Sequence, residues 1–340
     1  MLFYLLLIFF VLLMFLLMKL SVEQNNNVKR RILYTLEIVV VVIFVFRYDV
    51  GWDYKNYYYI VADNVPSERC EPLSALFIAV AQYFKSPQLL FILYGVLTYV
   101  LFFKSINRNS CNVEFSLLIY LCLFIFDSLG LIRQSLAVAI VFSGYKYVCE
   151  MKFLKFLILV FVAMGFHYSA IVAFLIYPLY YMRFYYYLFF SIALIFIKEL
   201  LFKIILNDRF YTVYLENESL MKGGDKIFIF YSIMNIILLI FVLYNKNKEM
   251  KGLCKISFFA LILWVLFGSG IAIRLSLYNI IFLVFLIPLV LKSYSKIRLL
   301  FGFIFIIYFF LILYVSSQNE IKSPFLPYKN VFFNSGESFK

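Results

Sequence analysis

Long apolar runs recur along the whole chain, and they limit its fold more than any other feature. Of the 340 residues, 65% are hydrophobic, whereas a soluble domain is about half apolar. Many of these runs are long enough for an α-helix to cross the ~30 Å of hydrocarbon in a bilayer. The strict alternation of a membrane β-barrel strand is absent from the sequence. The sequence therefore predicts an all-α polytopic membrane protein, with one integral membrane domain over residues 1–340.

We expect about twelve transmembrane helices, several of them short for a full crossing. The apolar segment 73–84 has only twelve residues, so it should form a short interfacial or re-entrant helix. The first run has no charged n-region and no small-residue cleavage site, which is typical of a retained anchor. The expected spans are 2–18, 32–46, 88–103, 114–127, 131–148, 153–166, 168–182, 184–206, 226–244, 255–269, 272–291 and 297–316.

The net charge of +13 is explained by the orientation of the loops. With the N-terminus outside and every span except 73–84 crossing, the inner loops hold 17 Lys and Arg against four Glu. The outer side holds 14 basic and 13 acidic residues. Positive charge gathers on the cytoplasmic side of membrane proteins, so no nucleic-acid partner is expected. The loops 47–72 and 207–225 and the tail 317–340 should then lie outside, on the side opposite the basic loops.

Charged residues within or beside the spans gather at the outer ends of those spans. Ionisable groups cost several kcal/mol in lipid, so they should face a cavity or one another. This placement predicts a polar site that opens outward. Its candidate members are Arg47, Asp49, Asp53, Asp127, Arg133, His167 and Arg274.

The first polar interruption contains two acids four residues apart, Asp49 and Asp53. They could hold sugar hydroxyls, or one of them could act as a general base. The simpler alternative is a pair of solvated loop acids beside Arg47 and Lys55. No third ligand lies nearby, so no metal site is expected.

Aromatic residues surround these acids at Trp52, Tyr54 and Tyr57. Aromatic faces cover the apolar C–H side of sugar rings, so the stretch resembles a carbohydrate-binding surface. An aromatic belt at the membrane interface is the alternative.

Three later residues could carry the chemistry. Arg133 lies at a helix start, where a guanidinium suits a phosphate or diphosphate; a local ion pair with Asp127 is the alternative. His167, the only histidine, can take a proton from a hydroxyl near neutral pH, or it shapes its turn through a helix-end hydrogen bond. Arg274 could make a second phosphate contact, or its side chain could snorkel to the interface.

Five short motifs resemble, in order and spacing, those of the EpsG-like, Wzy-type polysaccharide polymerases. The resemblance covers residues from about 45 to 330. The motifs are Arg47…Gly51-Trp52-Asp53-Tyr54…Tyr57, Ile132-Arg133-Gln134-Ser135-Leu136-Ala137, Phe166-His167-Tyr168-Ser169-Ala170, Arg274 with Tyr278, and Pro327-Tyr328.

The resemblance implies a multi-pass glycosyltransferase of the bacterial inner membrane, with GT-C-like architecture, no cofactor and an active site facing the periplasm. It would polymerise undecaprenyl-diphosphate-linked oligosaccharide units into O-antigen or capsular polysaccharide, together with a flippase and a chain-length regulator. The expected diphosphate ligands are Arg133, Arg274 and Arg47. The first candidate for the base that activates the acceptor hydroxyl would be His167, and the next candidates would be Asp49 and Asp53. The expected sugar contacts are Trp52, Tyr54, Tyr57, Gln134 and Tyr328.

Two other functions fit parts of this pattern. A different polyprenyl-linked-sugar glycosyltransferase, adding single sugars, usually has a carboxylate in its first large outer loop, which Asp49 and Asp53 could supply. A lipid-linked oligosaccharide flippase or transporter would tend to show repeat symmetry and broken helices at the midplane. No repeat is visible here, and the charges lie at one end of the spans. The loop 207–225 matches no motif, so substrate choice could reside there.

Overall fold

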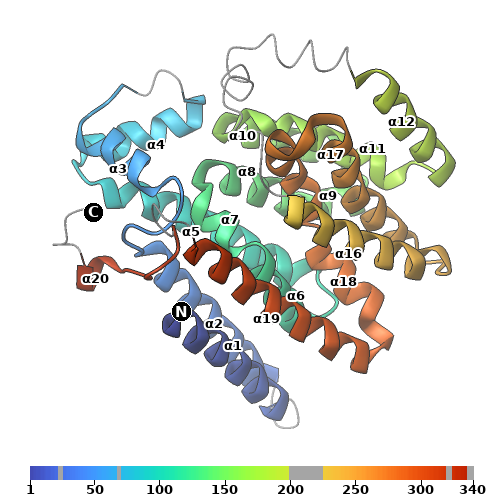
Figure 1. The fold of residues 1–340 in the computed structure, drawn as a ribbon, viewed down its shortest axis with the longest axis horizontal. Helices are drawn as coiled ribbons and strands as arrows, with labels where there is room; N and C mark the ends of the chain where they lie inside the picture. Colours follow the sequence, from blue (N-terminus) through green and yellow to red (C-terminus); the bar gives the residue numbers. More distant parts are fainter. Residues whose placement is uncertain (22–25, 67–69, 199–224, 319–323, 335–340) are drawn as a thin grey trace.

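The computed structural model describes residues 1–21, 26–66, 70–198, 225–318 and 324–334. Within these ranges every regular element is a helix, and the one extended pairing is an isolated bridge between Arg47 and Asn330. The expected all-α fold is therefore confirmed (Figure 1). The helices are α1 (Leu2–Ser21), α2 (Asn26–Val45), α3 (Tyr54–Ala62), α4 (Pro72–Tyr83), α5 (Pro87–Asn109), α6 (Val113–Leu123), α7 (Ile125–Gly130), α8 (Ile132–Ser143), α9 (Tyr145–Cys149), α10 (Phe153–Phe166), η1 (Tyr168–Leu175), α11 (Ile176–Tyr181), α12 (Phe184–Phe196), α16 (Asp225–Leu243), α17 (Lys248–Ile280), α18 (Leu283–Val290), η2 (Leu291–Ser293), α19 (Ser295–Ser317) and α20 (Val331–Asn334).

Helix length and hydropathy identify a membrane protein. Five described helical stretches are long and apolar enough to cross a bilayer, and they belong to α1, α5, α16, α17 and α19. A sixth crossing would combine Gly270–Ile280 with α18, which meet at a bend of 53°. Other expected spans fold as shorter helices; for example, 114–127 is divided between α6 and α7, and 168–182 between η1 and α11. Helix length thus establishes fewer crossings than the twelve expected. The expected loop 207–225 lies outside the described residues up to Asp225, where α16 begins.

Helix α8 lies at the centre of the bundle (Figure 1). Its residues from Gln134 to Phe142 are all buried, and it packs against both α5 and α10. A helix that is apolar on every side is suited to such a position. Small residues such as Ala137 and Ala139 let the neighbouring helices approach closely. Because α8 begins at Ile132, its first turn presents polar residues at one end of this apolar core.

Two of the expected interruptions coincide with helix ends. Leu131 separates α7 from α8, and α10 ends before His167, whose backbone is extended (φ −158°, ψ 118°). In a membrane protein, non-helical backbone is tolerated where it is buried in protein or lines a cavity. These two breaks therefore mark the region where a polar site can form.

The expected separation of spans 255–269 and 272–291 has its counterpart at Gly268, where one apolar helix ends and the next begins at Gly270. Helix α17 runs through this region and is kinked at Gly268, which has φ 72° and ψ −179°. Glycine adopts this conformation at little cost because it has no Cβ. A second break follows between α17 and α18, where the two helices meet at a bend. Arg274 consequently lies on the helical arm that follows the kink, inside the expected span 272–291.

The segment 324–334 packs against the loop that follows α2. The backbone N–H of Gly51 donates to the carbonyl of Pro324 at 2.6 Å, and that of Tyr48 donates to Lys329 at 2.9 Å. The Tyr4 hydroxyl of α1 donates to the carbonyl of Phe325 at 3.0 Å. The tail, α1 and the first loop therefore form one packed region at the same end of the molecule (Figure 1).

Candidate functional site

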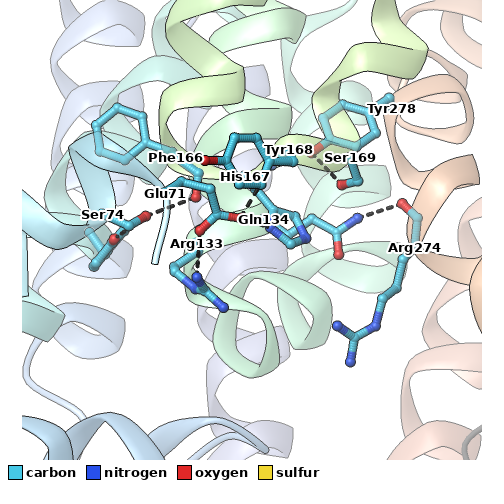
Figure 2. Close-up of polar contacts among 11 residues, drawn as sticks. Glu71, Ser74, Arg133, Gln134, Phe166, His167, Tyr168, Ser169, Arg274 and Tyr278 are labelled. Atoms are coloured by element: carbon cyan, nitrogen blue, oxygen red, sulfur yellow. Dashed lines mark hydrogen bonds and ion pairs between the residues drawn. The ribbon is translucent and has the colours of Figure 1, made fainter. Parts of the chain in front are cut away.

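The side chain of Glu71 connects two of the expected site residues. Its Oε2 accepts from Nη1 of Arg133 at 2.5 Å, and its Oε1 lies 2.9 Å from Nδ1 of His167. The same Oε1 also accepts from the backbone N–H of Tyr168 at 3.2 Å. Only 6% of the Glu71 side chain is exposed. Three separate helices, α4, α8 and α10, thus converge on one buried carboxylate (Figure 2).

Local sequence explains why Glu71 is free to reach across. It is the N-cap residue of α4, with an extended backbone, and its side chain makes no capping hydrogen bond to its own helix. Pro72 at the first helical position lacks an N–H and has a φ suited to the helix start. Ser74 donates to the carbonyl of Phe166 at 2.8 Å, and Tyr94 donates to Ser74 at 2.9 Å. These bonds fix the start of α4 against the end of α10.

The environment keeps the Glu71 carboxyl ionised. Burial by itself raises its pKa, but the hydrogen bond from His167 and the charge of Arg133 outweigh burial, so the pKa lies below its ordinary value. Burial lowers the pKa of His167 below its ordinary value of 6.5, although the hydrogen bond to Glu71 opposes that shift. A neutral imidazole that donates from Nδ1 to a carboxylate keeps its lone pair on Nε2. His167 is therefore set up to accept a proton at Nε2.

Helix α17 joins the cluster through its backbone. The Gln134 amide donates to the carbonyl of Arg274 at 2.5 Å, and the hydroxyls of Ser169 and Tyr278 lie 3.0 Å apart. Gln134 is therefore bound by the backbone carbonyl of Arg274 and not by its guanidinium. In Figure 2 the guanidinium groups of Arg133 and Arg274 extend to the same side of the cluster.

Asp53 lies within the electrostatic reach of these arginines. Burial raises the pKa of its carboxyl to about 6, and the charges of Arg274, Arg133 and Arg47 act against that rise. The structure therefore brings Asp53, Arg133, His167 and Arg274 into one electrostatic neighbourhood.

The loop that carries Asp53 is clamped onto the end of α7. Gly51 has φ 111°, and a Cβ there would lie 2.1 Å from the carbonyl oxygen of Leu129. The backbone N–H of Asp53 donates to Gly130 at 3.2 Å. Gly130 in turn lies against the ring of Trp52. Because α7 is followed directly by α8, this clamp holds the loop near the first turn of α8.

Gly51→Ala should disrupt the clamp. The alanine Cβ would collide with backbone, and its φ would be strained at a cost of about 1–3 kcal/mol. The expected result is a fall in the thermal unfolding midpoint of the detergent-purified protein by about 2 °C or more. Gly302→Ala is the matched control, since a Cβ there meets its nearest atom at 3.6 Å. An unchanged midpoint for Gly51→Ala would contradict the clamp.

Arg47 does not join the Glu71 cluster. It is 1% exposed, and its guanidinium lies over the ring of Phe91, 5.6 Å from the centroid. Its Nε and Nη2 atoms are buried and make no hydrogen bond to the described residues. As a diphosphate ligand it would therefore need to be uncovered first. Arg133 forms its ion pair with Glu71 and not with Asp127. The backbone carbonyl of Asp127 accepts a hydrogen bond from the Ser135 hydroxyl at 2.9 Å.

The expected sugar contacts occupy different environments. Trp52 is 57% exposed, and Tyr57 is buried with its ring 5.5 Å from the guanidinium carbon of Arg133. Tyr54 stacks on Phe91 at 4.1 Å. Tyr328 is used in packing, since its hydroxyl donates to the carbonyl of Ile43 and its ring stacks on Phe3. The side chains of Tyr54 and Tyr328 therefore serve the fold in this structure. Asp49 is also buried, and it has a left-handed backbone with φ 52°.

Glu71 was not among the residues expected from the sequence. In the sequence it is one of several acids between residues 47 and 72. A usable signal was present, because an acid followed by proline at the start of a helix too short to span is well placed to face a polar site. Within the described ranges, no three His, Cys, Asp or Glu side chains are grouped so that they could hold a metal ion. The guanidinium groups of Arg133 and Arg274 place positive charge on one side of the site, which suits an anionic ligand.

Comparison with known proteins gives one result. No curated protein and no solved structure matches the chain. The model of the EpsG family matches residues 30–330, a range that includes every residue of the Glu71 cluster and the loop from Arg47 to Asp53. With most of its length covered, the chain belongs to the EpsG family.

Proposed function

We propose that this membrane protein is a glycosyltransferase that polymerises oligosaccharide repeat units carried on undecaprenyl diphosphate, at the periplasmic face of the bacterial inner membrane. The observation that carries the proposal is the Glu71 carboxylate, which holds a cation, Arg133, and a base, His167, side by side. Transfer of a sugar from a lipid diphosphate needs both. Family membership supports a role in polysaccharide biosynthesis.

The proposed reaction breaks one bond and forms another. The anomeric carbon of the growing chain leaves the diphosphate oxygen and bonds to a hydroxyl of the incoming repeat unit. That hydroxyl loses its proton to Nε2 of His167. The lipid diphosphate departs with the bonding electrons, and its growing negative charge is stabilised by Arg133 and Arg274. No nucleotide sugar is required, in keeping with the periplasm.

Glu71 acts in this scheme as a positioning residue. It fixes the imidazole with its proton on Nδ1, and its charge stabilises the imidazolium that forms when Nε2 accepts the acceptor's proton. It also holds Arg133 through a single nitrogen, Nη1. A guanidinium has five N–H donors, so Arg133 retains several for phosphate oxygens.

The remaining features complete the proposal. Trp52 and Asp53 would receive the acceptor sugar, beside the arginines. We place the site on the outer side of a bundle of about twelve crossings with GT-C-like architecture, because the basic loops lie at the other side. A flippase would deliver the repeat units, and a chain-length regulator would act on the product.

Deletion of the gene tests the function. The expected result is surface polysaccharide that carries a single repeat unit, with the ladder of longer chains absent from a gel and restored by the intact gene. Loss of the single-unit form as well would contradict a polymerase and indicate a flippase. A shortened repeat unit would indicate a transferase of single sugars.

Orientation is tested separately, in a cysteine-free variant. Asn56→Cys places a thiol on the exposed surface of α3, next to the proposed site. We expect an impermeant thiol reagent to label it in intact spheroplasts, whereas Lys251→Cys, on an expected inner loop, should react only after lysis. The opposite labelling pattern would reverse the orientation.

A further inference from the structure

A second site lies between α2 and α5, at their far end from Glu71. The Gln88 amide ties the start of α5 to the carbonyl of Val45 at the end of α2, at 3.1 Å. The two helices run from there to a cavity of about 700 Å³ lined by residues such as Arg30 and Lys104. Arg30 lies fifteen positions before Val45 in α2, a rise of about 22 Å, so the basic end of the cavity lies at the opposite end of the helix from the loop that carries Asp53.

The cavity carries an excess of positive charge. Among the described residues, its lining includes Arg30, Lys104 and Arg108 and one acid, Glu37. The Glu37 carboxylate already accepts from the amide of Asn107 at 2.7 Å. Lys104 is exposed and forms no ion pair with a described residue.

Two of the cations keep donors available. Arg30 donates from Nε to the hydroxyl of Tyr34 at 2.8 Å, which leaves the donors on its two terminal nitrogens. Arg108 lies 3.5 Å from Glu150 through one nitrogen, and half of its side chain is exposed. The site can therefore offer several N–H donors to a phosphate.

The polarity of the cavity changes along its length. Arg30 and Val42 both line it and are twelve positions apart in α2, a rise of about 18 Å. Beyond the basic end the walls are formed by apolar side chains, among them Val41, Val42 and Val100. Val42 and Val100 are 45% and 47% exposed, so this part is open at the side of the bundle. A charged end followed by an open apolar groove matches a phospholipid headgroup and the start of its acyl chain.

We propose that this groove binds an anionic phospholipid. Its phosphate would contact Arg30, Lys104 and Arg108, and an acyl chain would lie along Val41, Val42 and Val100. The excess of positive charge favours an anionic over a zwitterionic headgroup. The apolar walls, which free phosphate would not need, favour a lipid. This site shares no residue with the proposed active site and does not rest on the proposed function.

Lipid titration of the full-length protein in detergent, followed by native mass spectrometry, tests the proposal. We expect phosphatidylglycerol to bind at least tenfold more tightly than phosphatidylcholine. Arg30→Gln and Lys104→Gln should each weaken phosphatidylglycerol binding about fivefold, since a basic residue at a membrane surface contributes about 1 kcal/mol. Lys251→Gln removes an exposed charge outside the cavity and should leave binding unchanged. Equal binding of the two lipids would overturn the proposal.

The apolar part of the site has its own test. Val100→Trp should fill the groove and weaken phosphatidylglycerol binding about tenfold. Val96→Trp, one turn away on the same exposed face and outside the cavity lining, should leave it intact. Equal effects of the two variants would contradict an acyl chain in the groove. Displacement of the lipid by millimolar inorganic phosphate would show that the site recognises the phosphate group without the acyl chain. That result would also overturn the proposal.

Discussion

Arg133→Ala should lower the rate of chain polymerisation at least a hundredfold while the protein remains inserted in the membrane. Loss of one group that stabilises charge developing in a transition state costs about 10²–10³ in rate. Arg133 is suited to that role because one of its nitrogens is held 2.5 Å from the buried carboxylate of Glu71 and the others remain available. The measurement is the growth of the product ladder from purified lipid-linked repeat units.

Three further variants make this result specific. Arg133→Lys keeps the charge but loses the planar fork of donors, so its rate should fall between those of the parent and Arg133→Ala. Arg274→Ala should also lower the rate about a hundredfold, because it removes the second guanidinium. The fold should be kept, because the backbone carbonyl at this position still accepts from Gln134. Arg183→Ala is the matched control, because that arginine is exposed and its guanidinium donates to Tyr185, outside the cluster. A normal ladder from Arg133→Ala would exclude it as a diphosphate ligand.

Sequence patterns predicted the parts of the site that depend on local structure. The change from apolar to polar residues at 130–134 and at 166–169 coincides with the ends of helices. Placing such ends on one side of the membrane was enough to expect Arg133 and His167 near each other. The physical basis is general, because charged groups and broken helices are both costly in lipid and tend to occur together in one protected region.

The pairing of these residues could not be read from the sequence. Glu71 meets Arg133 and His167 only because α4 packs against the end of α10, and that contact depends on the three-dimensional arrangement of three helices. Arg47 shows the opposite case. Its position in the chain resembled that of a site residue, but the aromatic ring of Phe91 covers it.

The number of membrane crossings could not be predicted from local sequence alone. Apolar runs such as 114–127 and 131–148 are continuous in composition, yet each folds as two helices. The boundaries lie at Phe124 and Gly144, where nothing in hydropathy signals a break. Hydropathy identifies which residues avoid water, but it does not distinguish a straight span from a bent one.

The pH profile of the reaction should identify the base. If His167 accepts the proton, only its neutral form is active, so kcat/KM should fall as the pH drops through the pKa of His167. Burial places that pKa below 6.5, and the hydrogen bond to Glu71 raises it in part. Glu71→Gln removes the charge that opposes burial. The acid limb of kcat/KM should therefore move to lower pH, and kcat should fall because the imidazole is no longer held in one tautomer.

Asp53 provides the decisive comparison, because its pKa of about 6 would produce an acid limb in a similar range. The charges that act on the pKa of Asp53 are those of Arg274, Arg133 and Arg47, so an Asp53 base predicts an acid limb that stays in place in Glu71→Gln. His167→Gln should lower kcat by about 10²–10⁴ and abolish the acid limb, whereas Asp53→Asn should retain the limb and raise KM for the acceptor. Glu249→Gln, which changes an acid bound to the hydroxyl of Tyr145 elsewhere in the fold, controls for loss of charge. An acid limb that stays in place in Glu71→Gln and disappears in Asp53→Asn would transfer the role of base from His167 to Asp53.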